Sequence, residues 1–325
     1  MDHDEVLRLF DHRMRRDAPP DHAGVRVERV GNVVRWTGGP NDWNGVVWSD
    51  LDAANADAAI AEQVRHYGAL GFGFEWKTYS HDTPADLGER LLRAGFTAGD
   101  PESLMVAETS APTAPTAPTD QVERAGGFRL VDMTDEVGID LAIEVHEAAF
   151  GTDGGRLRGQ LLERLAHAPD SFVVTLAMTG DRPVGSARVE FAPGADFAGL
   201  WGGGIVEEFR GRGLYRGLVA HRSGLAACRG VPLLLVDAMP TSRPILRRLG
   251  FERLGTTTPY LCAPRDVSGR PSGSPRRVGP APGPAPTSPF VPHGGADPGP
   301  SRGTTDRDRR SGPGGAPEGA PRQGR

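Results

Sequence analysis

The sequence predicts an α/β protein made of two related domains in tandem, each with a mixed sheet, followed by a disordered tail. Three observations support this fold class. Segments with strand and helix patterning alternate throughout residues 122–264. A similar helix-to-strand ending recurs in the first third of the chain. The remaining stretches are so rich in Pro, Gly, Ala and Thr that they cannot build a packed core.

Two shifts in composition set the domain boundaries. Residues 109–121 repeat Ala, Pro and Thr, which hold neither a helix nor a central strand, so we expect an extended linker. Residues 265–325 are Gly, Pro, Ser, Arg and Asp with almost no apolar side chains. They cannot bury enough surface to offset the entropy of ordering, so we expect a disordered tail. The predicted domains are therefore 1–108 and 122–264.

Periodicity predicts the elements of the second domain. Apolar residues three and four apart, such as Val137, Leu141 and Val145, indicate helices, and Val-, Phe- and Thr-rich runs between turn residues indicate strands. In chain order, we expect a strand at 128–133, helices at 135–150 and 157–165, strands at 171–178, 184–191 and 197–206, a helix at 214–229, a buried strand at 232–237, a helix at 241–249 and two closing strands within 251–262.

A helix followed by Gly and Phe closes each half of the chain. Residues 91–96, Leu-Leu-Arg-Ala-Gly-Phe, resemble residues 246–251, Leu-Arg-Arg-Leu-Gly-Phe, and an apolar or aromatic strand precedes each. We interpret this pair as an internal repeat and infer two related folds. The alternative is a chance match, because glycine commonly ends a helix.

Composition and charge narrow the class of protein. The net charge of −5 gives no global positive field, so we expect no nucleic-acid partner. The charged N-terminus lacks the apolar core of a signal peptide, and no apolar run approaches the roughly 20 residues of a membrane span. The two cysteines, Cys228 and Cys262, form no metal-ligand motif, so we expect no metal. These observations favour a cytoplasmic monomer or homodimer without a membrane partner.

Residues 205–218 carry the clearest chemical signal. A strand runs through a turn with Gly211 and Gly213 directly into a helix. Glycine adopts backbone conformations closed to other residues and lets main-chain N–H groups approach an anion. The first amides of a helix have no partners and lie at the positive end of its dipole, which suits a pyrophosphate. Three nearby arginines add positive charge: Arg210, Arg212 and Arg216. An ordinary strand-to-helix turn with solvated arginines is the alternative.

This turn and its flanking elements resemble the GNAT superfamily of acyl-CoA N-acyltransferases, over about 140 residues of the second domain. The family's pyrophosphate loop reads Gln/Arg-x-x-Gly-x-Gly/Ala, and residues 210–215 fit five of its six positions. The departure is Tyr215, which stands where the family has Gly or Ala. The resemblance implies acetyl-CoA as co-substrate, with these cofactor-binding residues: Ile205, Val206, Glu207, Arg210, Gly211, Arg212, Gly213, Leu214, Tyr215 and Arg216. Main-chain groups of Ile205 and Glu207 would bond the pantetheine arm where two strands splay apart.

The first domain lacks such a loop. Before its presumed helix stand residues 48–52, Trp-Ser-Asp-Leu-Asp, which are acidic where phosphates would need positive charge. We therefore expect 1–108 to be a degenerate GNAT-like domain that shapes the acceptor cleft and does not bind CoA.

A general base is the next requirement, because a thioester is attacked by a neutral amine. Many family members carry a Glu at the position of Gly199, so here the base must lie elsewhere or be absent. Glu190 is one candidate, on a strand face that it shares with Arg188; an ordinary ion pair is the alternative. Asp237 is the other, at the end of an apolar strand where clefts form; a partner for the next helix start is the alternative.

The general acid is also unusual. The family's Tyr that protonates the leaving thiolate is replaced by Leu246. We consider Tyr215 as a substitute, with helix-start packing as the alternative, and Tyr260 and Ser242 as further candidates. The sequence thus predicts transfer of an acetyl or short acyl group from acyl-CoA to an unknown amine by direct attack in a ternary complex. A non-catalytic acyl-CoA-binding or regulatory module is the other interpretation.

Overall fold

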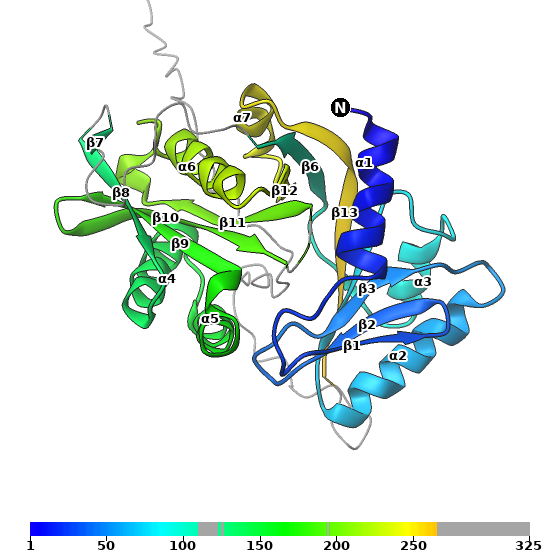
Figure 1. Cartoon of the computed structure of the whole chain (residues 1–325). Coiled ribbons are helices and arrows are strands. Elements are labelled where there is room, and N and C mark those ends of the chain that lie inside the picture. The colour runs from blue at the N-terminus through cyan, green and yellow to red at the C-terminus, as the bar shows by residue number, and fades with distance from the viewer. Residues whose placement is uncertain (110–122, 125–126, 193, 195, 265–325) are drawn as a thin grey trace, which may run out of the picture.

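The computed structural model describes residues 1–109, 123–124, 127–192, 194 and 196–264 (Figure 1). Within these residues, thirteen strands belong to one sheet. Twelve follow each other in the order β1-β2-β3-β4-β13-β6-β12-β11-β10-β9-β8-β7, and β5 pairs with β13 beside this path. The linker predicted at 109–121, apart from Thr109, and the tail predicted at 265–325 lie outside the described residues.

The elements of the N-terminal half (residues 1–108) are α1 (His3–Phe10), the π-helical turn η1 (Asp11–Arg16), β1 (Arg26–Val30), β2 (Val33–Thr37), β3 (Gly45–Ser49), α2 (Ala56–Leu70), β4 (Phe74–Tyr79), α3 (Leu87–Arg93), β5 (Thr97–Ala98) and β6 (Glu102–Glu108). Those of the C-terminal half (residues 123–264) are β7 (Glu123–Arg124), β8 (Phe128–Met133), α4 (Glu136–Phe150), α5 (Gly155–His167), η2 (Pro169–Ser171), β9 (Phe172–Thr179), β10 (Arg182–Phe191), β11 (Phe197–Ile205), η3 (Glu207–Phe209), α6 (Leu214–Cys228), β12 (Leu233–Ala238), α7 (Arg243–Arg248) and β13 (Glu252–Cys262).

The α/β class and the element order predicted for the C-terminal half are confirmed up to its last element. Helix α4 begins where the Asp135 side chain accepts a hydrogen bond from the Gly138 amide, and it ends at Gly151 in a left-handed conformation. The prediction of two closing strands is wrong, because β13 is one continuous strand of 11 residues. A register shift between Arg253 and Gly255 interrupts its pairing with β6 without ending the strand.

The two halves exchange their last strands. Strand β6, the last of the N-terminal half, pairs with β12 of the C-terminal half. Strand β13, the last of the chain, lies between β6 and β4. Each half otherwise repeats one pattern, in which antiparallel strands lead to a parallel pair joined by a helix: β3, α2 and β4 in one, β11, α6 and β12 in the other. The exchange therefore joins two similar sheets into one.

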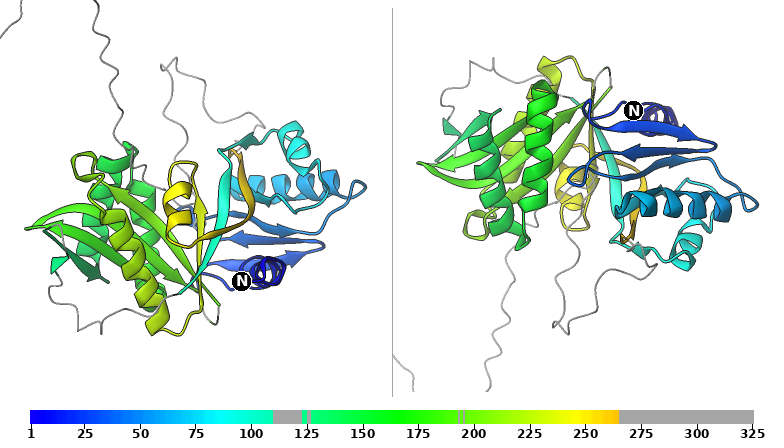
Figure 2. Two further views of the ribbon diagram at one scale, coloured as in Figure 1. Left: turned by 90° about the horizontal axis from the view of Figure 1, so that it is seen from above. Right: turned by 90° about the horizontal axis from the view of Figure 1, so that it is seen from below.

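Helices cover both faces of this sheet (Figure 2). Side chains of α6 and α7 pack with Leu234 and Val236 of β12, and α2 and α3 pack with Trp76 of β4. The opposite face carries α4 and α5 over β9, and α1 over β6 and β12. Directly paired residues share a face of a sheet. Asp237 pairs with Leu104, and Thr257 pairs with Glu102 on one side and with Tyr79 on the other. These side chains therefore lie on the face that α1, α4 and α5 cover.

Strands β11 and β12 separate partway along their length. Their parallel pairing runs only from Phe197 and Leu233 to Gly199 and Leu235. Beyond this point β11 continues beside β10 to Ile205, while β12 continues beside β6 to Ala238. The two strands therefore leave a split between their C-terminal ends, as expected from the sequence, and α6 starts next to it.

Candidate functional site

The turn before α6 has the geometry of an anion-binding site. Gly211 and Gly213 have φ angles of 75° and 84°, in the left-handed region where glycine is strongly favoured. Among the residues that the structure describes, no side chain caps the N-terminus of α6, and the first turn of this helix holds no acidic residue. The first amides of α6 therefore face outward at the positive end of the helix dipole, without an anion of the protein's own.

The three arginines of this turn have different roles. Arg210 donates from Nε to the carbonyl of Ile205 at 3.1 Å and from Nη2 to the carbonyl of Ala149 at 2.9 Å, so its guanidinium ties the turn to β11 and α4. Arg212 is exposed, bonds the carbonyl of Glu208 and lies over the ring of Phe209. Arg216 is exposed on the first turn of α6. Arg212 and Arg216 are thus the arginines that leave their charge at the surface of the turn.

The equivalent turn of the N-terminal half is already occupied by a carboxylate. Before α2, Oδ1 of Asp52 accepts hydrogen bonds from the amides of Ala54 at 2.8 Å and Asn55 at 2.9 Å. The carboxylate of Asp52 thus lies in the turn that precedes α2, while the amides of α2 itself have no side-chain cap within the described residues. An acidic group in this turn agrees with the expectation that the N-terminal half does not bind CoA through its own helix.

The main chain at the split is partly engaged. The amide of Val206 donates to the carbonyl of Val184 at 3.0 Å, which keeps it in the ladder with β10. The carbonyl of Ile205 accepts from Arg210, and Glu207 begins the turn η3. Contacts of Ile205 and Glu207 with a pantetheine arm stay a prediction.

Tyr215 packs against the sheet. A methyl group placed on Gly203 would lie 3.0 Å from Cε2 of Tyr215, so the absence of a side chain at Gly203 makes room for the ring. Burial raises the pKa of Tyr215 above its usual value, which keeps the phenol protonated. The packing alternative considered for Tyr215 accounts for this placement, and its role as an acid stays a prediction.

Glu190 lies directly opposite Gly199 in the β10–β11 ladder. A side chain at Gly199 would collide with the indole of Trp201, whose Nε1 would be 2.4 Å from its Cβ. Trp201 thus fills the place of the Glu that the GNAT resemblance leads one to expect, and Glu190 is the carboxylate beside it.

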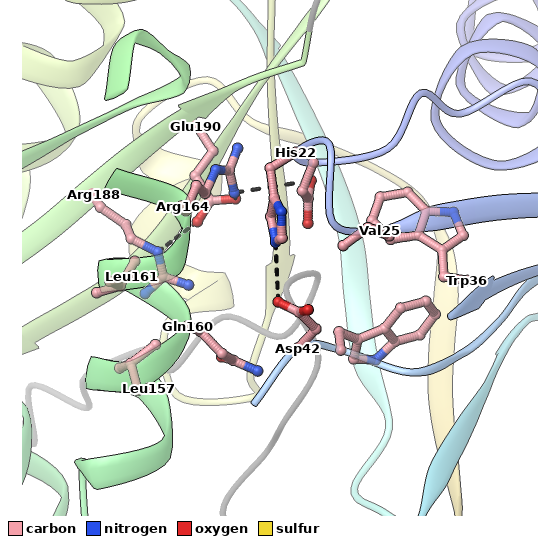
Figure 3. A pocket seen from close by; sticks show the side chains of 12 residues that line it. His22, Val25, Trp36, Asp42, Leu157, Gln160, Leu161, Arg164, Arg188 and Glu190 are labelled. Carbon is pink, nitrogen blue, oxygen red and sulfur yellow. Dashed lines mark hydrogen bonds and ion pairs between the residues drawn. The ribbon is translucent and has the colours of Figure 1, made fainter. Parts of the chain in front are cut away.

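Glu190 is held by two arginines, as Figure 3 shows. Oε2 accepts from Nη1 of Arg164 at 2.6 Å, and Oε1 accepts from Nε of Arg188 at 2.6 Å. Burial alone would raise the pKa of Glu190, but Arg164 and Arg188 outweigh it and hold the pKa below its usual range. A carboxylate with both oxygens engaged and a lowered pKa is a weak general base.

Glu190 faces a recess between the two halves (Figure 3). Leu157, Leu161 and Gln160 of α5 line one side, and residues of the N-terminal half line the other, where Nε2 of His22 lies 3.1 Å from Oδ1 of Asp42. The cavity measures about 30 Å³, which suits a water molecule and not an acyl acceptor. The recess therefore marks a contact between the halves.

Asp237 is buried on β12, two residues beyond the last pair with β11. Its Oδ2 accepts a hydrogen bond from Nζ of Lys77 at 2.6 Å, and no hydrogen bond to Oδ1 is present within the described residues. Burial raises the pKa of Asp237 above its usual value, and Lys77 opposes this shift. Glu190, Gly199, Leu235 and Asp237 share one face of the sheet, so both candidate carboxylates flank the split.

Sequence reasoning missed the two basic side chains that bond the candidate carboxylates, Lys77 and Arg164. Lys77 was a visible signal, because it is the only lysine in the chain. Arg164 gave no signal, since it is one of many arginines on a helix. In the part of the chain that the structure describes, His, Cys, Asp and Glu form no group of three or more suited to a metal ion. None of the described helices could cross a membrane.

Comparisons with known proteins identify the fold. No protein-family model and no curated protein matches the chain by sequence. A GCN5-related N-acetyltransferase from Kribbella flavida is similar in structure at 16% identity and a TM-score of 0.55, over 82% of this chain and 96% of its own. A conserved protein of unknown function from Staphylococcus epidermidis is similar at 17% identity and a TM-score of 0.54, over 75% and 95%. Since the Kribbella match is too long for either half alone, the chain has a GCN5-related N-acetyltransferase (GNAT) fold built from two halves in tandem.

Proposed function

We propose that this protein is an acyl-CoA-dependent N-acyltransferase whose C-terminal half binds the co-substrate. The observation that carries the proposal is the uncapped start of α6, with Gly211 and Gly213 in left-handed conformations, beside the split between β11 and β12. The diphosphate of acetyl-CoA would lie on the first amides of α6, with Arg212 and Arg216 at its edge. The pantetheine arm would enter the split and add hydrogen bonds to the exposed strand edge.

The reaction would be a direct transfer from acyl-CoA to an amine. A carboxylate takes a proton from the acceptor's ammonium group, and the neutral nitrogen attacks the thioester carbonyl. A C–N bond forms, the C–S bond breaks, and CoA leaves as a thiolate that takes up the second proton of the nitrogen through solvent. A main-chain N–H at the split would stabilise the oxyanion.

Asp237 is the better candidate for the base. One of its oxygens has no hydrogen-bond partner within the described residues, and burial raises its pKa above its usual value. Glu190 has both oxygens on arginines and a lowered pKa, so it is better suited to hold Arg188 and Arg164 in place. Tyr215, protonated and at the start of α6, is retained as the candidate acid.

A single substitution tests the binding site. In Gly213→Asp the new carboxylate would stand at the N-terminus of α6, where it would compete with the diphosphate for the first amides of the helix and repel it. We expect acetyl-CoA affinity, measured by calorimetry, to fall by about tenfold or more, or at least ~1.4 kcal/mol.

The matched control is Gly230→Asp. Gly230 has a φ of 71° and open space around it, like Gly213, but it follows the other end of α6. The Gly230→Asp substitution adds the same charge and similar backbone strain, and we expect the affinity for acetyl-CoA to stay unchanged. If the unsubstituted protein gives no heat with acetyl-CoA well above micromolar concentrations, or if both variants lose affinity equally, the proposal is wrong. Binding without turnover on any amine would instead favour a non-catalytic acyl-CoA-binding module.

A further inference from the structure

The only lysine of the chain lies beside the proposed base. Lys77 stands on β4 of the N-terminal half, and its side chain is about 1% exposed. Its Nζ lies 2.6 Å from Oδ2 of Asp237 on β12, 160 residues away in sequence. A sequence that otherwise uses arginine for its basic residues thus keeps its one lysine at a fully buried contact between the halves.

The strand exchange creates this contact. Strands β13 and β6 lie between β4 and β12. Strand β13 of the C-terminal half pairs with β4 of the N-terminal half, and β6 of the N-terminal half pairs with β12 of the C-terminal half. Both side chains point to the face that α1 and α5 cover, on which Glu190 and Gly199 also lie. The ion pair therefore depends on the tandem arrangement, and a single GNAT-like half could not form it.

Further titratable groups surround the pair. Glu75 and Tyr79 stand on β4 with Lys77, and Glu102 stands on β6; all three are buried. Within the described residues, Oε1 of Glu75, Oε2 of Glu102 and Oδ1 of Asp237 have no hydrogen-bond partner. The carboxyl groups of Glu75, Glu102 and Asp237 thus lie near the ammonium group of Lys77. Because Lys77 bonds Asp237, it favours the ionised form of Asp237 over those of the other two.

We infer that Lys77 is a positioning residue of the active site, which holds Asp237 ionised and oriented toward the split, so that the N-terminal half takes part in catalysis. This inference rests on the proposed function, in which Asp237 accepts the proton of the amine. Lys77 acts through Asp237 and does not itself touch the reacting atoms.

The electrostatics of the cluster agree with this role. Burial raises the pKa of Asp237, and Lys77 is the group that lowers it. Burial and then the charge of Asp237 raise the pKa of Glu102 to about 9, so Glu102 stays protonated at neutral pH. Burial also raises the pKa of Glu75 and of Tyr79. Without the ammonium group of Lys77, Asp237 would lose the group that lowers its pKa and would bind a proton at higher pH.

The kinetic test is the pH profile of Lys77→Met. Because the base works only when ionised, kcat/KM should fall on the acidic side, and this limb should move to higher pH in the variant. Each pH unit of displacement lowers kcat/KM by about tenfold on that side. At pH values above the displaced limb, kcat/KM of Lys77→Met should approach that of the unsubstituted protein. Lys77→Arg, which retains the charge, should shift the acidic limb less than Lys77→Met does. Asp237→Asn should abolish the acidic limb. The affinity for acetyl-CoA should stay unchanged in all three.

Arg15→Met is the matched control for loss of a buried cation. Arg15 is also about 1% exposed, and it bonds both oxygens of Asp82 in the N-terminal half at 2.7 and 2.9 Å. Both methionine variants should lower the melting temperature, and only Lys77→Met should move the acidic limb. A uniform loss of activity at every pH in Lys77→Met would show a purely structural role and overturn the inference.

Because the chain has one lysine, a lysine-specific isotope label gives a test that needs no turnover. In protein labelled with ¹³C at lysine Cε, the single side-chain signal reports on Lys77. We expect its chemical shift to show an inflection when Asp237 titrates, and this inflection to vanish in Asp237→Asn. If the inflection is absent in the unsubstituted protein, Lys77 does not sense Asp237 and the inference fails. If the inflection is present but no amine is acylated, the proposed function fails instead.

Discussion

At the scale of single residues, the environment of a carboxylate decides what it can do. Glu190 and Asp237 both lie buried on one face of the sheet, near the split between β11 and β12. Two guanidinium groups saturate the oxygens of Glu190, whereas one ammonium group bonds a single oxygen of Asp237. The same chemical group, a buried carboxylate, is therefore suited to structural support at one position and to proton transfer at the other.

The Glu190→Gln substitution tests the structural role. It leaves two buried arginines facing a neutral amide, so we expect a loss of about 3 kcal/mol in the free energy of unfolding at neutral pH, measured by denaturant titration. The pKa of Glu190 is lowered in the folded state. Its stabilising effect is thus complete above the unfolded pKa of about 4.3 and disappears as the pH falls through the folded value.

Glu208→Gln is the control for this prediction. Glu208 forms an ion pair with Arg182 at 2.6 Å, but both side chains are more than half exposed. Solvent screens such pairs, so the unfolding midpoint should not change. If Glu190→Gln is equally neutral, the buried bonds of Glu190 do not stabilise the fold.

At the scale of elements, the exchanged strands β6 and β13 decide how the halves depend on each other. Every residue of β12 is buried, and β6 covers the edge that β12 would otherwise expose. Strand β13 has its partners, β4, β5 and β6, in the other half. A half without its partner would expose a long apolar edge, which is a site for aggregation.

Separating the halves tests this dependence. We expect residues 122–325 produced alone to aggregate or to lack cooperative unfolding, and co-production with residues 1–121 to restore a folded complex. Size-exclusion chromatography and thermal unfolding of both preparations measure the effect. A monomeric C-terminal half that unfolds cooperatively and binds acetyl-CoA by itself would contradict the prediction.

At the scale of the whole molecule, the continuous sheet predicts that the protein unfolds as one unit. Contacts beyond the sheet also join the halves: Nη2 of Arg156 on α5 donates to the carbonyl of Asp42 at 3.2 Å, and Nη1 of Arg164 lies 4.0 Å from Oδ1 of Asp21. Neither half can lose its structure without exposing the core of the other.

Trp201→Phe makes this cooperativity measurable. It removes the only tryptophan of the C-terminal half, so the four that remain report on the N-terminal half alone. We expect urea unfolding followed by tryptophan fluorescence to coincide with unfolding followed by far-ultraviolet circular dichroism, which reports on the whole chain. Two separate midpoints would indicate that the halves unfold independently.

Local patterns made part of this protein predictable from its sequence. Element order follows from periodicity and capping residues, and the turn with Gly211 and Gly213 follows from the short-range geometry of glycine and helix termini. Such features depend on residues a few positions apart. The acidic turn at Asp52 was readable for the same reason, and the structure adds that its carboxylate bonds two amides of the turn before α2.

Only the tertiary structure decided which strands pair and what the buried charges contact. Strand β13 has the same sequence whether it pairs within its own half or with the other, because strand patterning carries no record of its partner. The contact of Lys77 with Asp237 depends on that choice, since it joins strands of different halves that β13 and β6 bring into one sheet. Sequence alone determined most of the elements and the glycine turn before α6, and long-range strand pairing determined that both halves meet at the candidate site.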